Sequence, residues 1–288
     1  MIGATWNSRS LARPGRKQAI ADFIHDHKVE FIGFQETKKE IIDPSFLNYI
    51  AGNFDFNWFS LPAKKTAGGI LVGFRTDLFE VISFSAKEFC VVSIVRSISD
   101  NFIWQLVVVY GSAYYEHKLE FIAELHDVME SSSTPTLVFG DFNLVRSAKE
   151  KSNEVFNAHF SFLFNDWVNR WSLIELKPSN RLFTWSNNQS NNLIQAALDK
   201  VFVSTDWDNH FPMSSVQALP RAVSDHTPLL IDTGQNNPPP PRLFRFEKWW
   251  LNYPDYHDLV TSVWHSPCPC TDALDIWQFK LRSLRKKI

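Results

Sequence analysis

Thr136-Leu137-Val138-Phe139-Gly140-Asp141-Phe142-Asn143 joins a short apolar run to a polar turn. The first four residues have the apolar, β-forming character of a buried strand. Asp141 and Asn143 follow directly after that run, where the strand would end. Because Asp and Asn after a strand are most often turn residues, this stretch alone predicts only a strand and its turn.

The same succession of apolar runs and polar junctions recurs along the first 232 residues. Besides 136–139, short β-rich runs lie at 29–34, 69–74, 103–110, 198–203 and 228–231. Three segments carry apolar residues at helical spacing, namely 16–28, 116–130 and 157–171. Strands outnumber helices, and some consecutive strands have no helix between them. The sequence therefore predicts an α+β layered sandwich rather than a singly parallel sheet.

The composition is typical of a folded globular protein, with 44% hydrophobic and 15% aromatic residues in a chain of 288. The formal net charge is −2, so any attraction to a polyanion such as DNA must come from local patches. Three cysteines without paired spacing favour a reducing compartment and argue against structural zinc. No run approaches the roughly 18 apolar residues of a membrane span, and no secretory signal is visible. An intracellular protein without membrane association is expected.

The strand pattern breaks after Asp232. Residues 233–243 include four consecutive prolines, which predict a stiff, extended linker. Residues 244–288 contain amphipathic helical stretches but are too few for a core of their own. The sequence therefore predicts a functional domain at 1–232, a linker and a helical tail.

Several polar residues share a place at the start or end of an apolar run: Asn7, Glu36, Tyr110, Asp141, Asn143 and the triplet Ser224-Asp225-His226. Asp199 falls inside the run 198–203, where an unpaired buried carboxylate would be costly. Pairing Asp199 with His226 would remove that cost and fix the tautomer of the imidazole.

Phosphodiester hydrolysis is a chemistry that needs these residue types. Magnesium prefers oxygen ligands, one or two of them carboxylates, and Glu36 is the natural ligand; Mn²⁺ could substitute for Mg²⁺. Asp141, held by the amide of Asn143, could align and deprotonate the attacking water. Donors to the phosphate oxygens are available in three other side chains, those of Asn7, Tyr110 and His226. The scheme needs no small-molecule cofactor.

Taken together, these motifs resemble the endonuclease/exonuclease/phosphatase superfamily, and its apurinic/apyrimidinic-endonuclease-like members in particular. More narrowly, they resemble the endonuclease domain of plant LINE-type non-LTR retrotransposons. The matching segments run in the family's order over residues 4 to 232: Trp6-Asn7, Gln35-Glu36-Thr37, Tyr110-Gly111, Gly140-Asp141-Phe142-Asn143, Thr184-Trp185-Ser186-Asn187, Leu198-Asp199-Lys200 and Ser224-Asp225-His226.

The resemblance implies a DNase I-like, four-layer α/β/β/α sandwich with the active site at one edge. It implies a metal ligand at Glu36, aided by Asp225, and a water-activating Asp141. Asp199 would orient His226. The remaining implied roles are support of Asp141 or contacts to phosphate and substrate, from Asn143, Asn7, Tyr110, His226, Thr184, Ser224 and Arg9.

The activity implied by this resemblance is nicking of double-stranded DNA in the nucleus, which would prime reverse transcription; a monomer is expected. Residues 244–288 would be the truncated start of a segment that leads to a reverse transcriptase. Two residues depart from the family pattern. Arg9 stands where the repair branch has a second metal-binding Asp, and Ser10 replaces a Gly, so a positive φ there would be strained. Two alternatives stay open: a phosphatase of the same superfamily acting on a small phosphoester, and a folded remnant without activity.

Overall fold

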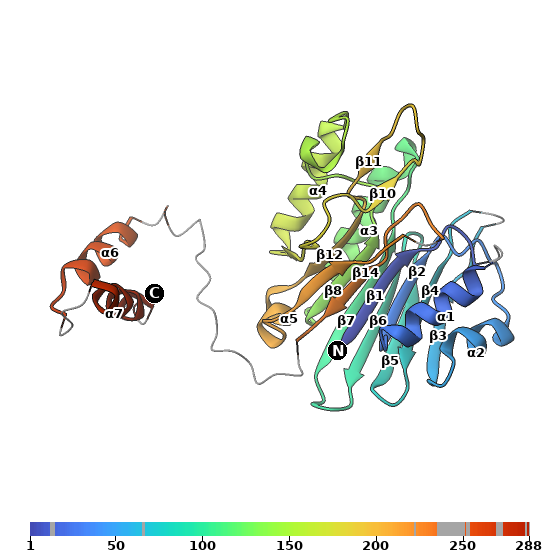
Figure 1. Ribbon diagram of the computed structural model, residues 1–288, viewed down its shortest axis with the longest axis horizontal. Helices are drawn as coiled ribbons and strands as arrows, with labels where there is room; N and C mark the ends of the chain where they lie inside the picture. The colour runs from blue at the N-terminus through green and yellow to red at the C-terminus, as the bar shows by residue number, and fades with distance from the viewer. Residues whose placement is uncertain are drawn as a thin grey trace. The chain divides into compact units, whose positions relative to one another are not determined.

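A computed structural model of the chain describes residues 1–11, 15–64, 67–221, 223–234, 251, 254–268, 273–285 and 287. The chain divides into two compact units, Met1–Asn237 and Pro238–Ile288. The larger unit contains two six-stranded sheets (Figure 1). The smaller unit contains two helices, α6 (Tyr256–His265) and α7 (Ala273–Arg285).

The first sheet has the strand order β13-β14-β1-β2-β4-β3. Its strands are β1 (Ile2–Asn7), β2 (Phe31–Gln35), β3 (Phe56–Leu61), β4 (Ile70–Arg75), β13 (Ser215–Ala218) and β14 (Leu229–Asp232). The second sheet has the order β5-β6-β7-β8-β12-β9. Its strands are β5 (Phe79–Ala86), β6 (Cys90–Ser97), β7 (Ile103–Tyr110), β8 (Thr136–Asp141), β9 (Ile174–Glu175) and β12 (Asp199–Val203). A separate two-stranded ribbon pairs β10 (Trp185–Ser186) with β11 (Gln195–Ala196).

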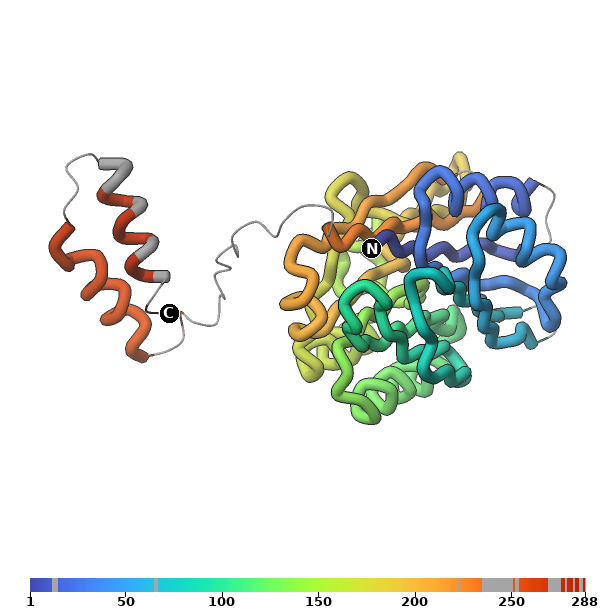
Figure 2. Tube along the Cα trace, turned by 90° about the horizontal axis from the view of Figure 1, so that it is seen from below, coloured from blue at the N-terminus to red at the C-terminus, as the bar shows by residue number. Residues whose placement is uncertain are grey.

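Helices cover the outer face of each sheet: α1 (Arg16–Asp26) and α2 (Pro44–Ala51) the first, α3 (Lys118–Glu130) and α4 (Ala158–Arg170) the second. Figure 2 shows α1 and α3 on opposite sides of the strands. A short helix, α5 (Thr205–His210), and two 3₁₀ turns, Tyr115–His117 and Ala148–Glu150, complete this unit among the described residues.

Alternation along the strands builds the layers. Phe31 of β2 lies in the cluster between the sheets, whereas its neighbour Ile32 packs with α1 and α2. Val108 of β7 likewise faces the other sheet, and Val107 faces α3 and α4. Successive strand residues point to opposite faces, so each sheet is buried on both sides. The predicted four-layer sandwich is confirmed.

The close approach of the two sheets explains why position 33 on β2 is a glycine. A Cβ on Gly33 would lie 2.6 Å from Phe139 Cε2 and 2.6 Å from Val108 Cγ1. No side chain fits at that point, because core atoms are already at van der Waals contact.

The topology gathers strand ends at one edge of the sandwich. β1 is parallel to β2, and β7 is parallel to β8, so their carboxyl ends meet there. β12 and β14 run antiparallel to β8 and β1, so these two strands begin at the same edge. The register places Asp199 opposite Asp141 and Asn7 beside Gln35. Residues distant in sequence are therefore brought into one site.

The predicted elements are present with shifted boundaries. The strand predicted at 136–139 continues through Asp141, and the helix predicted at 116–130 begins at Lys118 after a 3₁₀ turn. Six strands of the large sheets, β1, β3, β5, β6, β9 and β13, were not predicted. β5 is mostly exposed, so it lacks the apolar run on which the prediction depended.

The described helices of the smaller unit are amphipathic, with Val263 and Leu284 buried. Most of the predicted linker, 235–243, lies outside the described residues, and so do residues 244–250 of the tail. The division at Asp232 stays a prediction. None of the described helices is long and apolar enough to cross a membrane.

Candidate active site

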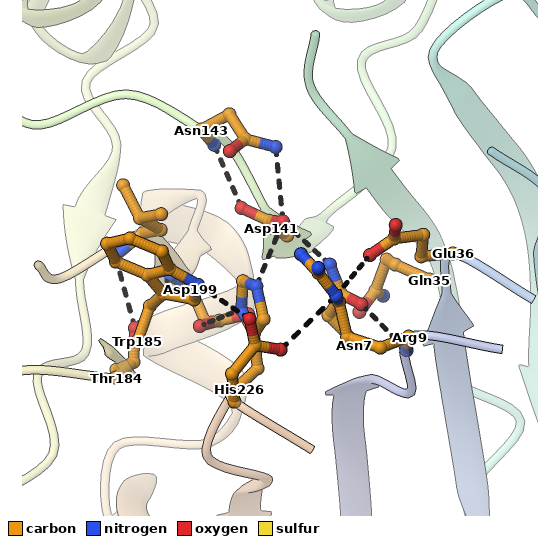
Figure 3. Close-up of polar contacts among 12 residues, drawn as sticks. Asn7, Arg9, Gln35, Glu36, Asp141, Asn143, Thr184, Trp185, Asp199 and His226 are labelled. Carbon is orange, nitrogen blue, oxygen red and sulfur yellow. Dashed lines mark hydrogen bonds and ion pairs between the residues drawn. The ribbon is translucent and has the colours of Figure 1, made fainter. Parts of the chain in front are cut away.

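Asp141 lies at the centre of a polar cluster at this edge (Figure 3). It is 1% exposed at the end of β8, and its carboxylate is held by two amides. Asn7 Nδ2 donates to Asp141 Oδ2 at 2.8 Å, and Asn143 Nδ2 donates to the same oxygen at 3.1 Å. The backbone N–H of Asn143 donates to Oδ1 at 3.0 Å. The carboxylate is therefore fixed in position from both sides.

His226 and Asp199 form a buried pair beside Asp141. His226 Nδ1 lies 2.9 Å from Asp199 Oδ2, and Nε2 lies 3.8 Å from Asp141 Oδ2. A carboxylate on Nδ1 places the proton there and fixes the orientation of the ring. The structure thus contains the pairing expected from the sequence, and Nε2 points to the side of Asp141 (Figure 3).

Burial and neighbouring charges shift the pKa values of this cluster. Burial raises the pKa of Asp141 well above its usual range, against the opposing effects of His226 and Asn7. Burial by itself would lower the pKa of His226, but the carboxylates of Asp199 and Asp141 outweigh it and raise that pKa. A carboxylate and an imidazole that both bind a proton more tightly than usual can exchange one between substrate and solvent.

Tyr110 ends β7 and lines the same site. Burial raises the pKa of its phenol, and the negative charges of Glu36 and Asp141 raise it further. The phenol is therefore a hydrogen-bond donor at neutral pH.

A second pair of carboxylates, Glu36 and Asp225, lies beside this cluster. Arg9 Nε is 3.5 Å from Glu36 Oε2 and 3.4 Å from Asp225 Oδ1. Lys38 Nζ is 3.0 Å from Glu36 Oε1. Trp185 Nε1 donates to Asp225 Oδ2 at 3.1 Å, whereas Asp225 Oδ1 is buried without a hydrogen-bond partner.

Two sets of residues are candidates to hold a cation. Asp141, Asp199 and His226 offer ligand atoms within 4.8 Å of one another. Their atoms are already engaged, because Asp141 Oδ2 accepts two amide bonds and His226 Nδ1 is paired with Asp199. Asp225 Oδ1 has no such bond. The pair Glu36 and Asp225 therefore fits a hard divalent cation better, since such ions bind carboxylate oxygens.

The hydroxyls of Thr184 and Ser224 contact the backbone of site residues, and their contact with substrate stays a prediction. Thr184 is 1% exposed, and its Oγ1 accepts the backbone N–H groups of Leu198 and Asp199 at 3.1 and 2.9 Å. Ser224 Oγ donates to Asn7 O at 2.8 Å and accepts from His226 N at 3.1 Å. Both hydroxyls hold the backbone of site residues, so a positioning role fits them better. Arg9, the third predicted substrate contact, is the exposed one, with 40% of its side chain accessible.

Lys118 is a site residue that the sequence did not reveal. Its Nζ donates to Ser112 O at 3.0 Å and to Asn143 O at 2.8 Å. Burial lowers the pKa of this lysine to about 8, with Asp141 acting in the opposite direction. A lysine at the start of a predicted helix is usually a solvated charge, so no sequence signal separated this one.

Hollows adjoin the central cluster, and two of them reach Asn143 and Tyr110. One, of about 280 Å³, is lined by Asn143 together with Trp185 and Phe156 and the basic side chains of Lys118 and Lys151. The other, of about 320 Å³, is lined by residues that include Tyr110, Tyr114, Phe89, Lys64 and His117. Space is thus open next to Asn143 and next to Tyr110.

Half of the ten described non-glycine residues with positive φ lie at this edge. Five residues of the site loops have positive φ: Arg9 (54°), Ser10 (104°), Glu36 (54°), Lys38 (54°) and Asn143 (49°). Such conformations cost about 1–3 kcal/mol each in residues other than glycine and cluster at functional sites.

The endonuclease/exonuclease/phosphatase family model matches residues 4–226, which include all the strand ends gathered at the site edge except the beginning of β14. The chain belongs to this family. No curated protein matches the chain at a significant level of sequence similarity.

Solved structures with the family's fold act on different substrates according to their names. The AP endonuclease LMAP from Leishmania major is 15% identical, with a TM-score of 0.63 over 80% of this chain and 86% of its own. The endonuclease domain of TRAS1, a telomere-specific non-LTR retrotransposon, is 15% identical, with a TM-score of 0.60 over 82% and 99%. The mannosyl-6-phosphatase Bt3783 from Bacteroides thetaiotaomicron is 15% identical, with a TM-score of 0.57 over 81% and 98%. At these identities the likeness shows the fold alone, and the substrate must be argued from the site.

Proposed function

We propose that the chain is a divalent-metal-dependent endonuclease that nicks double-stranded DNA. The observation that carries this proposal is the fixed carboxylate of Asp141, with the His226–Asp199 pair on one side and the Glu36–Asp225 pair nearby. Phosphodiester hydrolysis needs an aligned water, a proton acceptor and stabilisation of charge on the phosphate oxygens.

Each residue of the cluster has a role in this proposal. Asp141, held by two amides, orients the attacking water and accepts its proton, which its raised pKa favours. His226, oriented by Asp199, donates from Nε2 to a phosphate oxygen. Tyr110, kept neutral by burial and by nearby negative charge, donates to the phosphate or to the leaving oxygen.

Glu36 and Asp225 would hold the metal in this proposal. Oδ1 of Asp225 supports that assignment, because it is buried and has no hydrogen-bond partner. When bound, Mg²⁺ or Mn²⁺ would supply a Lewis acid that neutralises charge on the phosphate and leaving oxygens.

The surroundings of the site favour DNA over a small phosphoester. An internal phosphodiester needs room on both sides, and hollows lie next to Asn143 and next to Tyr110. Lys118, Lys151 and Trp185 line one of them, and the combination of cations with an aromatic ring suits a nucleic-acid strand. The phosphatase alternative has no comparable support among the described residues.

Origin from a plant LINE-type retrotransposon is the finer part of this proposal. It rests on the ordered motifs of residues 4 to 232, and the fold shared with the TRAS1 endonuclease domain is compatible with it. A nuclear location and a monomeric state belong to the same proposal.

Relaxation of supercoiled plasmid tests the activity. Wild-type protein should convert plasmid to the open circle with Mg²⁺ but not with chelator. Asp141→Asn and His226→Ala should each lower the nicking rate by roughly 10² or more, because each removes a group that moves a proton or stabilises charge.

A matched control is His210→Ala, which breaks a His–Asp pair outside the site, where His210 Nε2 lies 3.0 Å from Asp100 Oδ2. This variant should nick like wild type. Wild-type rates from both Asp141→Asn and His226→Ala would overturn the site assignment. Release of phosphate from a small phosphomonoester without nicking would favour the phosphatase, and no metal-dependent hydrolysis of either substrate would favour the inactive remnant.

A further inference from the structure

The guanidinium of Arg9 lies between the two carboxylates that fit a metal (Figure 3). Its Nε is 3.5 Å from Glu36 Oε2 and 3.4 Å from Asp225 Oδ1. Both distances exceed the roughly 2.7–2.9 Å of a charge-assisted hydrogen bond. The guanidinium is therefore attracted to the carboxylates electrostatically without a hydrogen bond to either one. Lys38 Nζ faces the other oxygen of Glu36 at 3.0 Å. Cations of the chain therefore balance the charge of this carboxylate pair.

The backbone under Arg9 is held in place, whereas its side chain can leave. The N–H of Arg9 donates to Asn7 Oδ1 at 3.1 Å, and the N–H of Ser10 donates to Glu36 O at 2.7 Å. The side chain of Arg9 is 40% exposed, against 11% for Glu36 and 18% for Asp225. The guanidinium can thus rotate toward solvent without a change of fold, while the two carboxylates stay where they are.

We propose that Arg9 is an exchangeable counter-cation of the metal site. A divalent cation held by Glu36 and Asp225 would need carboxylate oxygens that the guanidinium Nε now faces, so the two cations would compete for them. Binding of the metal releases the guanidinium, which then contacts the anionic substrate. This second step rests on the proposed function, which supplies the phosphodiester.

The exchange predicts that metal and substrate bind with positive coupling. A phosphate that attracts the guanidinium frees the carboxylates for the metal, and the metal in turn frees the guanidinium for the phosphate. Coupling between two sites is reciprocal, so either titration can measure it. Arg9 is thus a positioning and specificity residue as well as a contact to the substrate.

Mn²⁺ binding without DNA tests the competition. The titration would follow the electron paramagnetic resonance signal of free Mn²⁺ for wild type and for Arg9→Ala. Loss of a positive charge a few ångströms from the metal should tighten Mn²⁺ binding by about tenfold or more. Arg9→Asn is a second variant, because asparagine tolerates the positive φ of 54° and so protects the loop from misfolding.

Arg96→Ala is the matched control for net charge. Arg96 is 39% exposed and pairs with Glu80 at 2.7 Å, so its removal deletes one positive charge with the same exposure as Arg9. It lies on β6 in register with Ile103 at the start of β7, away from Tyr110 at the other end of that strand. Mn²⁺ binding by Arg96→Ala should match wild type. Equal or weaker binding by both Arg9 variants would overturn the proposal.

Addition of a short DNA duplex tests the coupling. All arms would carry Asp141→Asn to keep the DNA intact. The duplex should tighten Mn²⁺ binding when Arg9 is present, and this gain should shrink by about threefold or more in Arg9→Ala. An unchanged gain would overturn the release of the guanidinium to substrate. Absence of DNA binding in every arm would instead count against the proposed function, while the titration without DNA still decides whether Arg9 competes with the metal.

Discussion

Replacement of Ser10 by glycine should stabilise the domain. Ser10 has a φ of 104°, a conformation that L side chains rarely adopt and glycine adopts freely. Its backbone cannot relax easily, because its N–H donates to Glu36 O at 2.7 Å and its carbonyl accepts from Arg16 Nη1 at 2.7 Å. The loop that carries Arg9 is therefore held in a strained shape that a glycine would adopt without cost.

The size of the effect follows from two opposing contributions. Relief of one strained φ is worth about 1–3 kcal/mol. Glycine also raises the conformational entropy of the unfolded chain, which costs about 0.4–1 kcal/mol. The net increase in the free energy of unfolding should be about 0.5–2 kcal/mol. For a domain of this size, each kcal/mol raises Tm by about 2–4 °C, so Ser10→Gly should raise Tm by about 1–8 °C.

Calorimetry and urea unfolding of wild type, Ser10→Gly and Ser10→Ala would test this reasoning. Alanine removes the hydroxyl but keeps the Cβ that causes the strain, so it should bring no gain. A Tm of Ser10→Gly at or below that of wild type would refute the strain argument. An equal rise in Ser10→Ala would assign the effect to the hydroxyl instead of the backbone.

The remaining predictions concern a buried ion network and the domain boundary. Lys200 Nζ contacts Glu150 Oε2 at 2.7 Å and Glu175 Oε1 at 3.4 Å, and the Lys200 side chain is only 2% exposed. Lys200→Met would leave both buried carboxylates without this partner, so it should lower the free energy of unfolding by about 3 kcal/mol or more. Lys64→Met breaks an exposed pair with Glu88, so it should lower the free energy of unfolding by less than about 1 kcal/mol. Equal urea midpoints for Lys200→Met and Lys64→Met would contradict this prediction. Thr233 is buried and its N–H donates to Met1 O at 3.0 Å, so a chain ending at Gly234 should fold and nick plasmid as the full chain does. Loss of its cooperative unfolding would place the boundary elsewhere.

Local sequence was enough to place half of the strands of the two large sheets and the residues at their ends. The run 136–139 and its polar successors became β8 with Asp141 at its end. An unpaired buried carboxylate at Asp199 would be costly, so the sequence predicted its pairing with His226. The structure contains that contact, at 2.9 Å. Edge strands such as β5 escaped prediction because their side chains are mostly exposed.

Roles that depend on partners far along the chain could not be predicted. Thr184 was expected near the substrate, yet its hydroxyl accepts the N–H of Asp199. Lys118 gave no signal, because its Nζ binds two carbonyl oxygens that only folding brings near it. Sequence motifs indicate which residue types a site contains. They do not indicate which side-chain atoms already have hydrogen-bond partners within the chain.

The sequence by itself determined the kind of chemistry, through carboxylates, amides and an imidazole at the ends of apolar runs. Those signals are local, because strand formation and turn residues depend on near neighbours. Tertiary structure alone decided which carboxylate oxygens are engaged and which are open. Asn7 reaches Asp141 across 134 positions of the chain, and Arg9 lies between Glu36 and Asp225. Hydrogen bonds and charge pairs act over a few ångströms, so the candidate metal site and its resident cation exist only once the sheets bring these strand ends together.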